Sequence, residues 1–367
     1  MDSTDVRGGP TRVDDGPTAA QPSRRPRRPP RGLRQFLLAL GVLIGVFVLL
    51  VGGGAWYLTD RYAGNIDRIA DVFSGLDEGS RPAPATPATP AGAAPVTFLL
   101  VGTDTRATAD EGADGGIAEG GRSDAVMLAR FSADRQHAQL VSIPRDSWVD
   151  VPGHGMNKIN SAYAFGGPTL LVQTVEQLTQ VRVDHYVAID FEGITQVTDD
   201  LGGVDVVVAE TTSNGPHTFP AGVNHLDGDQ ARWYLGQRYG LPGGDFDRVR
   251  RQQQFLEAVF RQLLDTDTFT DPGRLDGALL AVTGAIAVDD SLGDGDLLQL
   301  AYSLRDLPPG AVDSFTAPVL GTGTEGEASV VYLDDVAGER MWAYLQNDTL
   351  SQNAAEFDAE ALPDVPR

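Results

Sequence analysis

The segment VTFLLVG, residues 96–102, is apolar throughout and ends at a glycine, as a buried β-strand does. Helical patterns separate and follow several runs of this kind. Because strands that are apolar on both faces need cover on both faces, this combination predicts an α/β fold, or an α+β fold, with a central mixed sheet covered by helices on both faces. The other predicted strands are DAVMLARF (124–131), AQLVSIP (138–144), DHYVAID (184–190) and VDVVVA (204–209), and the predicted helices span residues 169–179, 191–201, 227–236, 247–264 and 294–304.

The folded domain is expected to extend from residue 96 to residue 346. Its last part contains two further strand-like runs, AVDSFTAPV (311–319) and ASVVYLD (328–334), which we expect to form a strand pair. A closing helix is predicted at residues 335–345. Residues 347–367 are acidic and are expected to fray.

A membrane anchor is predicted before this domain. Residues 35–59, QFLLALGVLIGVFVLLVGGGAWYLT, carry no charge and are long enough for a transmembrane helix, whereas a cleaved signal peptide would be shorter and closer to Met1. The preceding block SRRPRRPPRGLR (23–34) keeps the disordered, basic tail of residues 1–34 in the cytoplasm. The sequence therefore predicts a single-pass protein of the cell membrane whose C-terminal domain lies outside the cytoplasm.

Residues 60–95 connect the anchor to the domain. Spaced apolar residues predict a short helix over residues 60–76. The following segment GSRPAPATPATPAGAAP (79–95) has the composition of a semi-rigid linker, which would hold the domain away from the membrane.

The composition excludes several classes of function. The 367-residue chain has a formal net charge of -23 and contains no cysteine. Disulfides and thiolate metal sites are therefore excluded. Nucleic-acid binding is also excluded as the main function, because it needs a basic surface facing the phosphates.

Two aspartates flank the junction between the first two predicted strands. Asp104 and Arg106 lie in GTDTR (102–106) after the first strand, and Arg122 and Asp124 lie at the start of the second. If these strands are neighbours, the two aspartates meet at one edge of the sheet, where carboxylates repel each other unless a cation lies between them. Oxygen ligands favour Mg²⁺ or another hard divalent ion. The alternative for each aspartate alone is a role as a turn residue.

The third strand leads into SIPRDSWVDVPGHGMNKINSAYAFGG (142–167). This segment places Arg145 and Asp146 in the loop after the strand, and it contains Lys158, the only lysine of the chain. A single lysine among many arginines indicates a specific role for its side chain. The alternative is a solvated loop lysine.

The segment RYGLPGGDFDRVRRQQQF (238–255) concentrates arginines in an otherwise acidic protein. Helical spacing places Arg248, Arg251 and Gln252 on one face and directs Arg250 toward solvent. Arginine side chains near the end of a helix favour an anion of the phosphate type. The alternative is a salt-bridged surface helix.

The same segment also predicts the limits of this helix and its buried side. Asp245 or Asp247 is expected to cap its N-terminus. A separate, core-facing stripe is predicted for Val249, Leu256, Phe260 and Leu263.

These stretches occur in the order found in one protein family. GTDTR, GRSD, SIPRD, NKIN, DDLGGVDV, LDGDQA and R-x6-D-x2-R-x3-Q follow one another between residues 96 and 260, and their order makes them specific although each is short. The chain resembles the LytR-CpsA-Psr family of cell-wall ligases. The resemblance implies a membrane-anchored phosphotransferase that moves a glycopolymer 1-phosphate from a polyprenyl-pyrophosphate carrier to a peptidoglycan hydroxyl outside the membrane.

The resemblance also implies roles for individual residues. It implies that Asp104 and Asp124 bind Mg²⁺ or another hard divalent ion. Catalytic roles are expected for Arg145, Asp245 and Asp124, and the chemistry of phosphoryl transfer suggests either Asp245 or Asp124 as the base for the acceptor hydroxyl. An apolar groove for the lipid is expected among residues 170–208. The implied pyrophosphate ligands are Arg122, Arg145, Lys158, Arg238, Arg248 and Gln252.

One position departs from the family pattern. Gly236 stands where the family often has the first arginine of an Arg-x-Arg pair. The alternative functions are therefore a lipid-pyrophosphate-binding regulatory scaffold, or a lipid pyrophosphatase, with little or no ligase activity. The partners implied by the resemblance are the lipid-linked glycan, peptidoglycan and the membrane.

Overall fold

The computed structural model divides the chain into two compact units, residues 1–54 and 55–367, and the description below concerns the second. The predicted transmembrane segment, residues 35–59, lies outside the described residues. Among the described residues, no helix is long and apolar enough to cross a bilayer. The structure describes residues 61–62, 65–85, 93–103, 123–237, 239–242, 245–263, 276–277, 280, 282–304, 307–308, 311–358 and 360.

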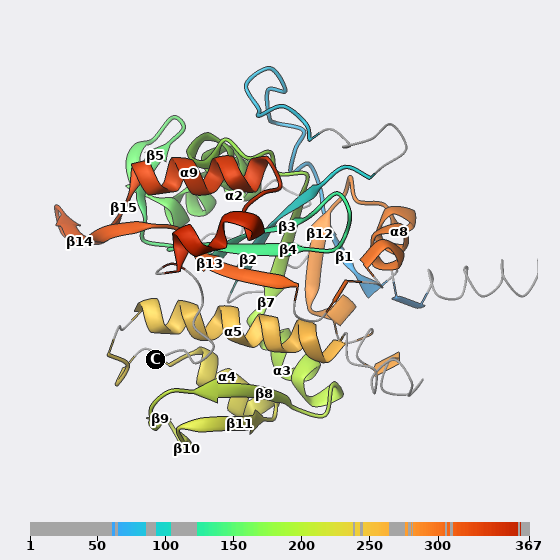
Figure 1. The fold of residues 1–367 in the computed structure, drawn as a ribbon, viewed down its shortest axis with the longest axis vertical. Coiled ribbons are helices and arrows are strands. Elements are labelled where there is room, and N and C mark those ends of the chain that lie inside the picture. The colour runs from blue at the N-terminus through green and yellow to red at the C-terminus, as the bar shows by residue number, and fades with distance from the viewer. Residues whose placement is uncertain are drawn as a thin grey trace, which may run out of the picture. The chain divides into compact units, whose positions relative to one another are not determined.

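A seven-stranded sheet forms the centre of this unit (Figure 1). Its strands are β1 (Asp67–Ile69), β2 (Val96–Thr103), β3 (Ser123–Phe131), β4 (Ala138–Ile143), β7 (His185–Asp190), β12 (Ile286–Asp289) and β13 (Val312–Thr316). The strand order is β1-β12-β7-β2-β3-β4-β13. The pairs β2–β3, β3–β4 and β7–β12 are antiparallel, whereas β1–β12, β2–β7 and β4–β13 are parallel. The predicted mixed α/β architecture is therefore confirmed.

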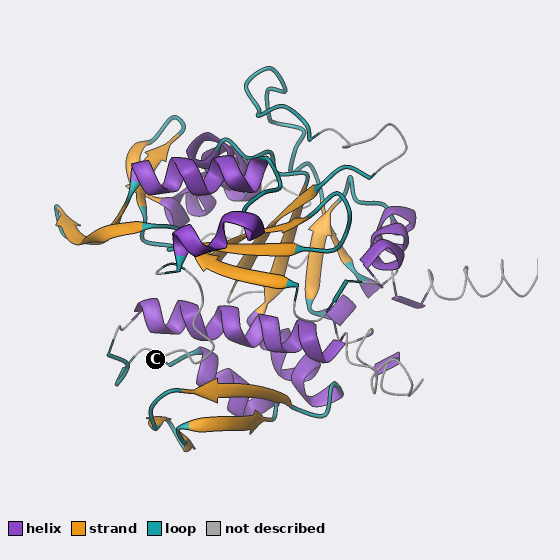
Figure 2. Cartoon of the chain, in the orientation of Figure 1, coloured by secondary structure: helices purple, strands orange, loops and turns teal. Residues whose placement is uncertain are grey.

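Helices cover both faces of the sheet (Figures 1 and 2). Leu99 and Val101 point to one face, where they join the core formed with α2 (Ile159–Thr179) and α9 (Asp335–Gln346). Leu100 points to the other face, toward α5 (Asp245–Leu263) and α8 (Asp294–Leu304). The alternation of apolar side chains to both sides explains why these strands are apolar throughout.

A smaller layer packs against the far side of α5. It consists of α3 (Phe191–Asp200), β8 (Val204–Val208), β11 (Gly222–Leu226) and α4 (Gly228–Leu235), with β9 (Thr212–Asn214) and β10 (His217–Phe219) beside them. Asp227 caps α4 in a capping box with Gln230, as the predicted helix start requires. Phe255 of α5 is buried in this layer, so α5 contacts apolar side chains on two sides.

The helix α2 is interrupted near its middle. Gly166 (φ -145°, ψ 20°) and Gly167 (φ 61°, ψ -156°) leave the helical conformation, and Pro168 begins the second part. The conformation of Gly167 is almost restricted to glycine. The sequence predicted only the second part of α2, because this interruption separates it from residues 159–165.

Two predictions about the ends of the domain are wrong. Residues 60–76 do not form one helix, because they contain β1, which pairs with β12 so that Asp67 lies opposite Ala287. The C-terminal segment does not fray from residue 347. Leu350 and Phe357, at either end of the 3₁₀ helix η3 (Ser351–Phe357), are buried in the core on the α2 side of the sheet.

The strand pairing near the C-terminus also differs from the prediction. The runs 311–319 and 328–334 meet only at their ends, where Val319 lies opposite Leu333. Instead, β13 joins the edge of the central sheet beside β4, with Phe315 opposite Val141. The second run forms β15 (Ala328–Leu333), which makes a hairpin with β14 (Val319–Glu325).

Candidate active site

Several of the predicted site residues belong to the chain segments where β2 and β4 end and β3 begins. The prediction that the first two strands are neighbours is confirmed, because β2 pairs with β3. The pairing shifts at its end: Gly102 lies opposite Ala125, but Thr103 lies opposite Ser123. Asp124 therefore occupies a β-bulge, a feature that redirects side chains and is frequent next to active sites.

Arg145, Asp146 and Lys158 form an ionic cluster beyond the end of β4. The Nζ of Lys158 lies 2.8 Å from one carboxylate oxygen of Asp146, and the Nε of Arg145 lies 3.8 Å from the other. Two cations, Arg145 and Lys158, thus share one carboxylate beyond the end of β4. The sequence left open a position in a loop for Lys158, but the structure places this residue in a strand. It ends β6 (Gly155–Lys158) and precedes α2, where the backbone N–H of Ile159 donates to the carbonyl of Ser147.

Arg248 and Gln252 lie one turn apart on α5. Both side chains are almost completely buried, with exposed fractions of 2% and 5%. The Oε1 of Gln252 is buried and has no hydrogen-bond partner within the described part of the chain. Buried polar atoms are nearly always satisfied, so this amide is a candidate for contact with a ligand.

Arg251 lies on the same helix but is engaged in internal contacts. Its guanidinium donates to the Oε1 of Gln237 at 2.6 Å and to the Oγ1 of Thr212 at 2.9 Å. It also lies 4.5 Å from the centre of the Tyr234 ring. Burial lowers the pKa of Arg251 and raises the pKa of Tyr234 to about 12, and Tyr234 therefore stays neutral beside the cation near pH 7. These contacts assign Arg251 to the packing of α5 against α4.

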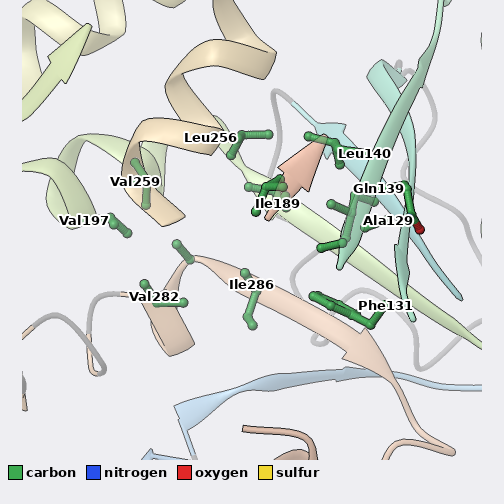
Figure 3. A pocket seen from close by; sticks show the side chains of 14 residues that line it. Ala129, Phe131, Gln139, Leu140, Ile189, Val197, Leu256, Val259, Val282 and Ile286 are labelled. Atoms are coloured by element: carbon green, nitrogen blue, oxygen red, sulfur yellow. The ribbon is translucent and has the colours of Figure 1, made fainter. Parts of the chain in front are cut away.

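An apolar cavity of about 220 Å³ lies between the sheet and the helices α3 and α5. Figure 3 shows Leu256 and Val259 of α5 and Val197 of α3 on one side, with Leu140 and Ile189 of the sheet on the other. For comparison, an apolar cavity of about 150 Å³ can hold benzene. The remaining lining residues are Leu100, Ala129, Phe131, Ala138, Gln139, Val282, Ala285, Ile286 and Val312.

One face of α5 connects the polar residues to this cavity. Leu256 follows Gln252 by one turn, and Gln252 follows Arg248 by one turn, so the three residues form a row along the helix. Val259 continues the row into the cavity. The face thus changes from cationic and polar at its start to apolar further along, as an amphipathic ligand requires.

Two expectations concern the apolar surfaces of this region. A lipid groove was expected among residues 170–208, and Ile189 and Val197 of that range line the cavity. Leu256 was expected in a core-facing stripe apart from Gln252, but it follows Gln252 on the same face. The signal that could have located it is the i, i+4 spacing from Gln252.

Several predicted site residues lie outside the description. Asp104, Arg106, Arg122 and Arg238 are not among the described residues, and the side chains of Asp124 and Asp245 are not described either. Within the described part, no group of three or more His, Cys, Asp or Glu side chains could hold a metal ion. The proposed ligand pair is consistent with the backbone, because Thr103, which precedes Asp104, lies opposite Ser123, which precedes Asp124.

Gly236 ends α4 in an ordinary right-handed helical conformation (φ -83°, ψ -5°). A Cβ atom at this position would lie 3.2 Å from the carbonyl oxygen of Arg232, which requires only a small adjustment. The backbone therefore does not demand glycine at this position.

These features define a mixed α/β protein with two cations around Asp146 beyond one end of its sheet and an apolar cavity between the sheet and α5. The LytR_cpsA_psr family model matches residues 77–347. The chain belongs to the LytR-CpsA-Psr family.

Two named proteins are similar to this sequence over most of its length. The polyisoprenyl-teichoic acid–peptidoglycan teichoic acid transferase TagU of Enterococcus faecalis is 31% identical over 279 residues, which cover 74% of this chain and 84% of that protein. The probable cell wall biosynthesis protein LcpB of Corynebacterium glutamicum is 34% identical over 274 residues, which cover 71% of this chain but only 64% of that protein.

Solved structures share the fold. The crystal structure of B. subtilis TagV matches with a TM-score of 0.58 and 25% identity, covering 70% of this chain and 97% of that chain. A structure of TagT bound to LIIa-WTA matches with a TM-score of 0.54 and 25% identity, covering 76% of this chain and 94% of that chain.

Proposed function

We propose that this protein transfers a glycopolymer 1-phosphate from a polyprenyl-pyrophosphate carrier to a hydroxyl group of peptidoglycan. The proposal includes a membrane anchor at residues 35–59 and a catalytic domain outside the cytoplasm. The name of the E. faecalis relative, a teichoic acid–peptidoglycan transferase, supports the reaction class.

The observation that carries the proposal is the single face of α5 described above. Arg248 and Gln252 suit a phosphate group, and Leu256 and Val259 suit an apolar chain attached to it. A polyprenyl pyrophosphate has these two parts in this order. The cavity contains enough space for part of a lipid chain, and its lining is almost entirely apolar.

The charged residues have complementary tasks in this proposal. Arg145 and Lys158 attract the pyrophosphate and stabilise the negative charge on the phosphoryl group during its transfer. Asp146 holds both cations in place between its two oxygens. Phosphoryl transfer needs little covalent participation by the protein, so positioning and charge account for most of the catalysis.

Asp104 and Asp124 are the proposed ligands of Mg²⁺ or another hard divalent ion. Such an ion, when bound, would neutralise charge on the phosphate oxygens. Either Asp124 or Asp245 is proposed to accept the proton of the attacking hydroxyl. Arg122 and Arg238 complete the proposed set of pyrophosphate ligands.

The proposal is tested with the full-length protein in detergent micelles. It is given a polyprenyl-pyrophosphate-linked glycan and soluble peptidoglycan strands, and products are identified by mass spectrometry. Arg248→Ala should lower kcat/KM for transfer by about 100-fold, because it removes a buried cation from the proposed phosphate site. The matched control is Arg250→Ala on the same helix, which should remain within about twofold of the wild type.

The same assay decides between the proposal and its alternatives. An Arg248→Ala variant that transfers the glycopolymer at the wild-type rate would contradict the proposed phosphate site. Release of free glycan phosphate without peptidoglycan product would identify a lipid pyrophosphatase. Gly236 motivates the scaffold alternative, and Gly236→Arg tests it: a large gain in transfer would show that the natural protein is a weak catalyst, whereas no change would count against that reading.

A further inference from the structure

The hairpin formed by β5 (Trp148–Val151) and β6 has one buried and one exposed face. Val149 and Val151 belong to the core beneath α2. Because side chains alternate, Trp148 and its cross-strand partner Lys158 lie on the other face. Met156 lies on this outer face too and is 50% exposed.

An aromatic pair lies at the tip of the hairpin, and one of its members is separated from Met156 by a single residue of the chain. His154, in the turn before β6, stacks on Phe165 of α2 with ring centres 4.5 Å apart and an angle of 15° between the rings. Phe165 is 46% exposed, although it is a large apolar side chain. The break in α2 at Gly166 follows it directly. Exposed apolar side chains grouped in this way mark interaction surfaces.

We propose that His154, Met156 and Phe165 form a binding surface for the glycan strand of the peptidoglycan acceptor. The inference rests on the proposed function. The stacked rings cover one face of each other, and their outer faces can meet the C–H face of a pyranose, whose axial hydrogens are attracted by an electron-rich ring. Alternate residues along a strand lie about 7 Å apart, so the surface continues from Lys158 away from the ionic cluster.

The position of this surface relative to the sheet favours the acceptor over the donor glycan. The hairpin and α2 cover one face of the sheet, whereas α5 and the cavity lie on the other (Figure 1). In phosphoryl transfer the attacking and leaving oxygens lie roughly in line, on opposite sides of the phosphorus. With the lipid in the cavity, the lipid phosphate leaves on the α5 side. The attacking hydroxyl therefore approaches from the side of the hairpin.

Methionine labelling gives a direct test, because the chain has four methionines. Full-length protein with ¹³C-labelled methionine methyl groups is studied by NMR in detergent micelles. Soluble, uncross-linked peptidoglycan strands should shift the Met156 signal, whereas the buried Met127 and Met341 serve as internal references. A Met156 signal that does not move with these strands, or that moves only with the lipid-linked donor, would overturn the proposal.

Kinetics of variants provide the second test. Phe165→Ala and His154→Ala should each raise KM for the soluble strands by about fivefold to tenfold, with unchanged KM for the lipid-linked donor and unchanged kcat. Tyr302→Ala, which removes an aromatic side chain that is 68% exposed on α8, is the matched control and should change neither KM.

Failure of this inference can be told apart from failure of the proposed function. An unchanged acceptor KM in both variants, or an increase confined to the donor KM, contradicts the surface while transfer itself persists. A wild-type protein that forms no transfer product contradicts the proposed function. The Met156 signal still decides in that case whether the surface binds the strands.

Discussion

Arg250 and Arg251 are neighbours on α5 with opposite surroundings. The side chain of Arg250 is 37% exposed, whereas Arg251 is only 1% exposed. Arg251 donates to Gln237, and the Nε2 of Gln237 donates in turn to the backbone carbonyls of Ser213 and Tyr239. Through Gln237, Arg251 therefore fixes the residues on both sides of Arg238, which is a proposed pyrophosphate ligand.

Replacement of Arg251 should destabilise the protein. In Arg251→Met, the buried Gln237 and the half-buried Thr212 lose their donor, so the free energy of unfolding should fall by about 2–4 kcal/mol. Urea unfolding followed by circular dichroism measures this change. Arg250→Met is the control and should stay within about 0.5 kcal/mol of the wild type. Equal effects of the two substitutions would contradict the role given to Arg251.

The sequence predicted the helical face shared by Arg248, Arg251 and Gln252, but not their different roles. Helical spacing shows which side chains point the same way. It does not show that Gln237, on the segment after α4, reaches Arg251. Lys158 is a similar case: its uniqueness in the chain drew attention to it, whereas its ion pair with Asp146 depends on how the hairpin returns to the end of β4.

Asp289 joins β12 to β7 through its side chain. The carboxylate is fully buried; one oxygen accepts the backbone N–H of Tyr186 at 3.0 Å and lies 3.2 Å from the Nδ1 of His185. The other oxygen accepts hydrogen bonds from the backbone and side chain of Ser291. Burial alone would raise the pKa of Asp289, but the hydrogen bonds from His185, Ser291 and Tyr186 outweigh it, so the pKa is lowered.

This lowered pKa predicts how stability depends on pH. The unfolded pKa of an aspartate is about 3.9, so the contribution of Asp289 is fully present above that pH and is lost as pH falls through the lower folded pKa. Asp289→Asn should lower the free energy of unfolding at pH 7 by about 1–3 kcal/mol and weaken its decline below pH 4. Urea unfolding at a series of pH values checks both effects.

The matched control for Asp289 keeps the carboxylate. Ser291→Ala removes the hydroxyl that donates to the Asp289 carboxylate but leaves the backbone N–H in place. This variant should retain most of the pH dependence of stability. If Asp289→Asn lost stability with acid as steeply as the wild type, another group would be responsible for the decline.

Most strands and helices could be predicted from the sequence, and the exceptions have physical causes. β1 has only three residues, and its partner β12 lies far along the chain, so no local pattern reveals the pairing of Asp67 with Ala287. The first part of α2 was missed because Gly166 and Gly167 interrupt its periodicity. Leu350 and Phe357 were assigned to a fraying tail because two apolar residues in an acidic segment carry little weight without their tertiary contacts.

The cavity results from how the layers of the protein are spaced. The sheet and α5 are both apolar where they face each other, yet their side chains do not fill all of the space between them. A sequence in which both faces of the strands are apolar cannot indicate which face retains open space. For this reason the sequence could not locate this cavity.

A substitution that fills the cavity should affect the free energy of unfolding and the KM for the lipid-linked donor in different ways. Ala129→Leu adds three carbons at the cavity wall, so the free energy of unfolding should be unchanged or raised by up to about 2 kcal/mol. The KM for a lipid-linked donor should rise about tenfold or more, because the added carbons occupy space proposed for the lipid. Thermal unfolding and transfer kinetics measure the two effects.

Ala125→Leu is the control for this substitution. Ala125 lies on the same strand and the same face but does not line the cavity, so the larger side chain should overpack the core and lower the free energy of unfolding by about 1–3 kcal/mol. If Ala129→Leu were as destabilising as Ala125→Leu, the cavity would not be open space in solution.

Both edge strands of the central sheet, β1 and β13, pair with strands from distant parts of the chain. Asp67 pairs with Ala287 at one edge, and Ala138 pairs with Val312 at the other. Pairings over such long separations slow folding, since the loop between the partners must close before any contact compensates for its entropy. A chain under synthesis therefore exposes unpaired apolar strands until its last segment emerges, and such strands aggregate readily. The yield of this protein in a cell should accordingly depend on chaperones that shield the incomplete sheet.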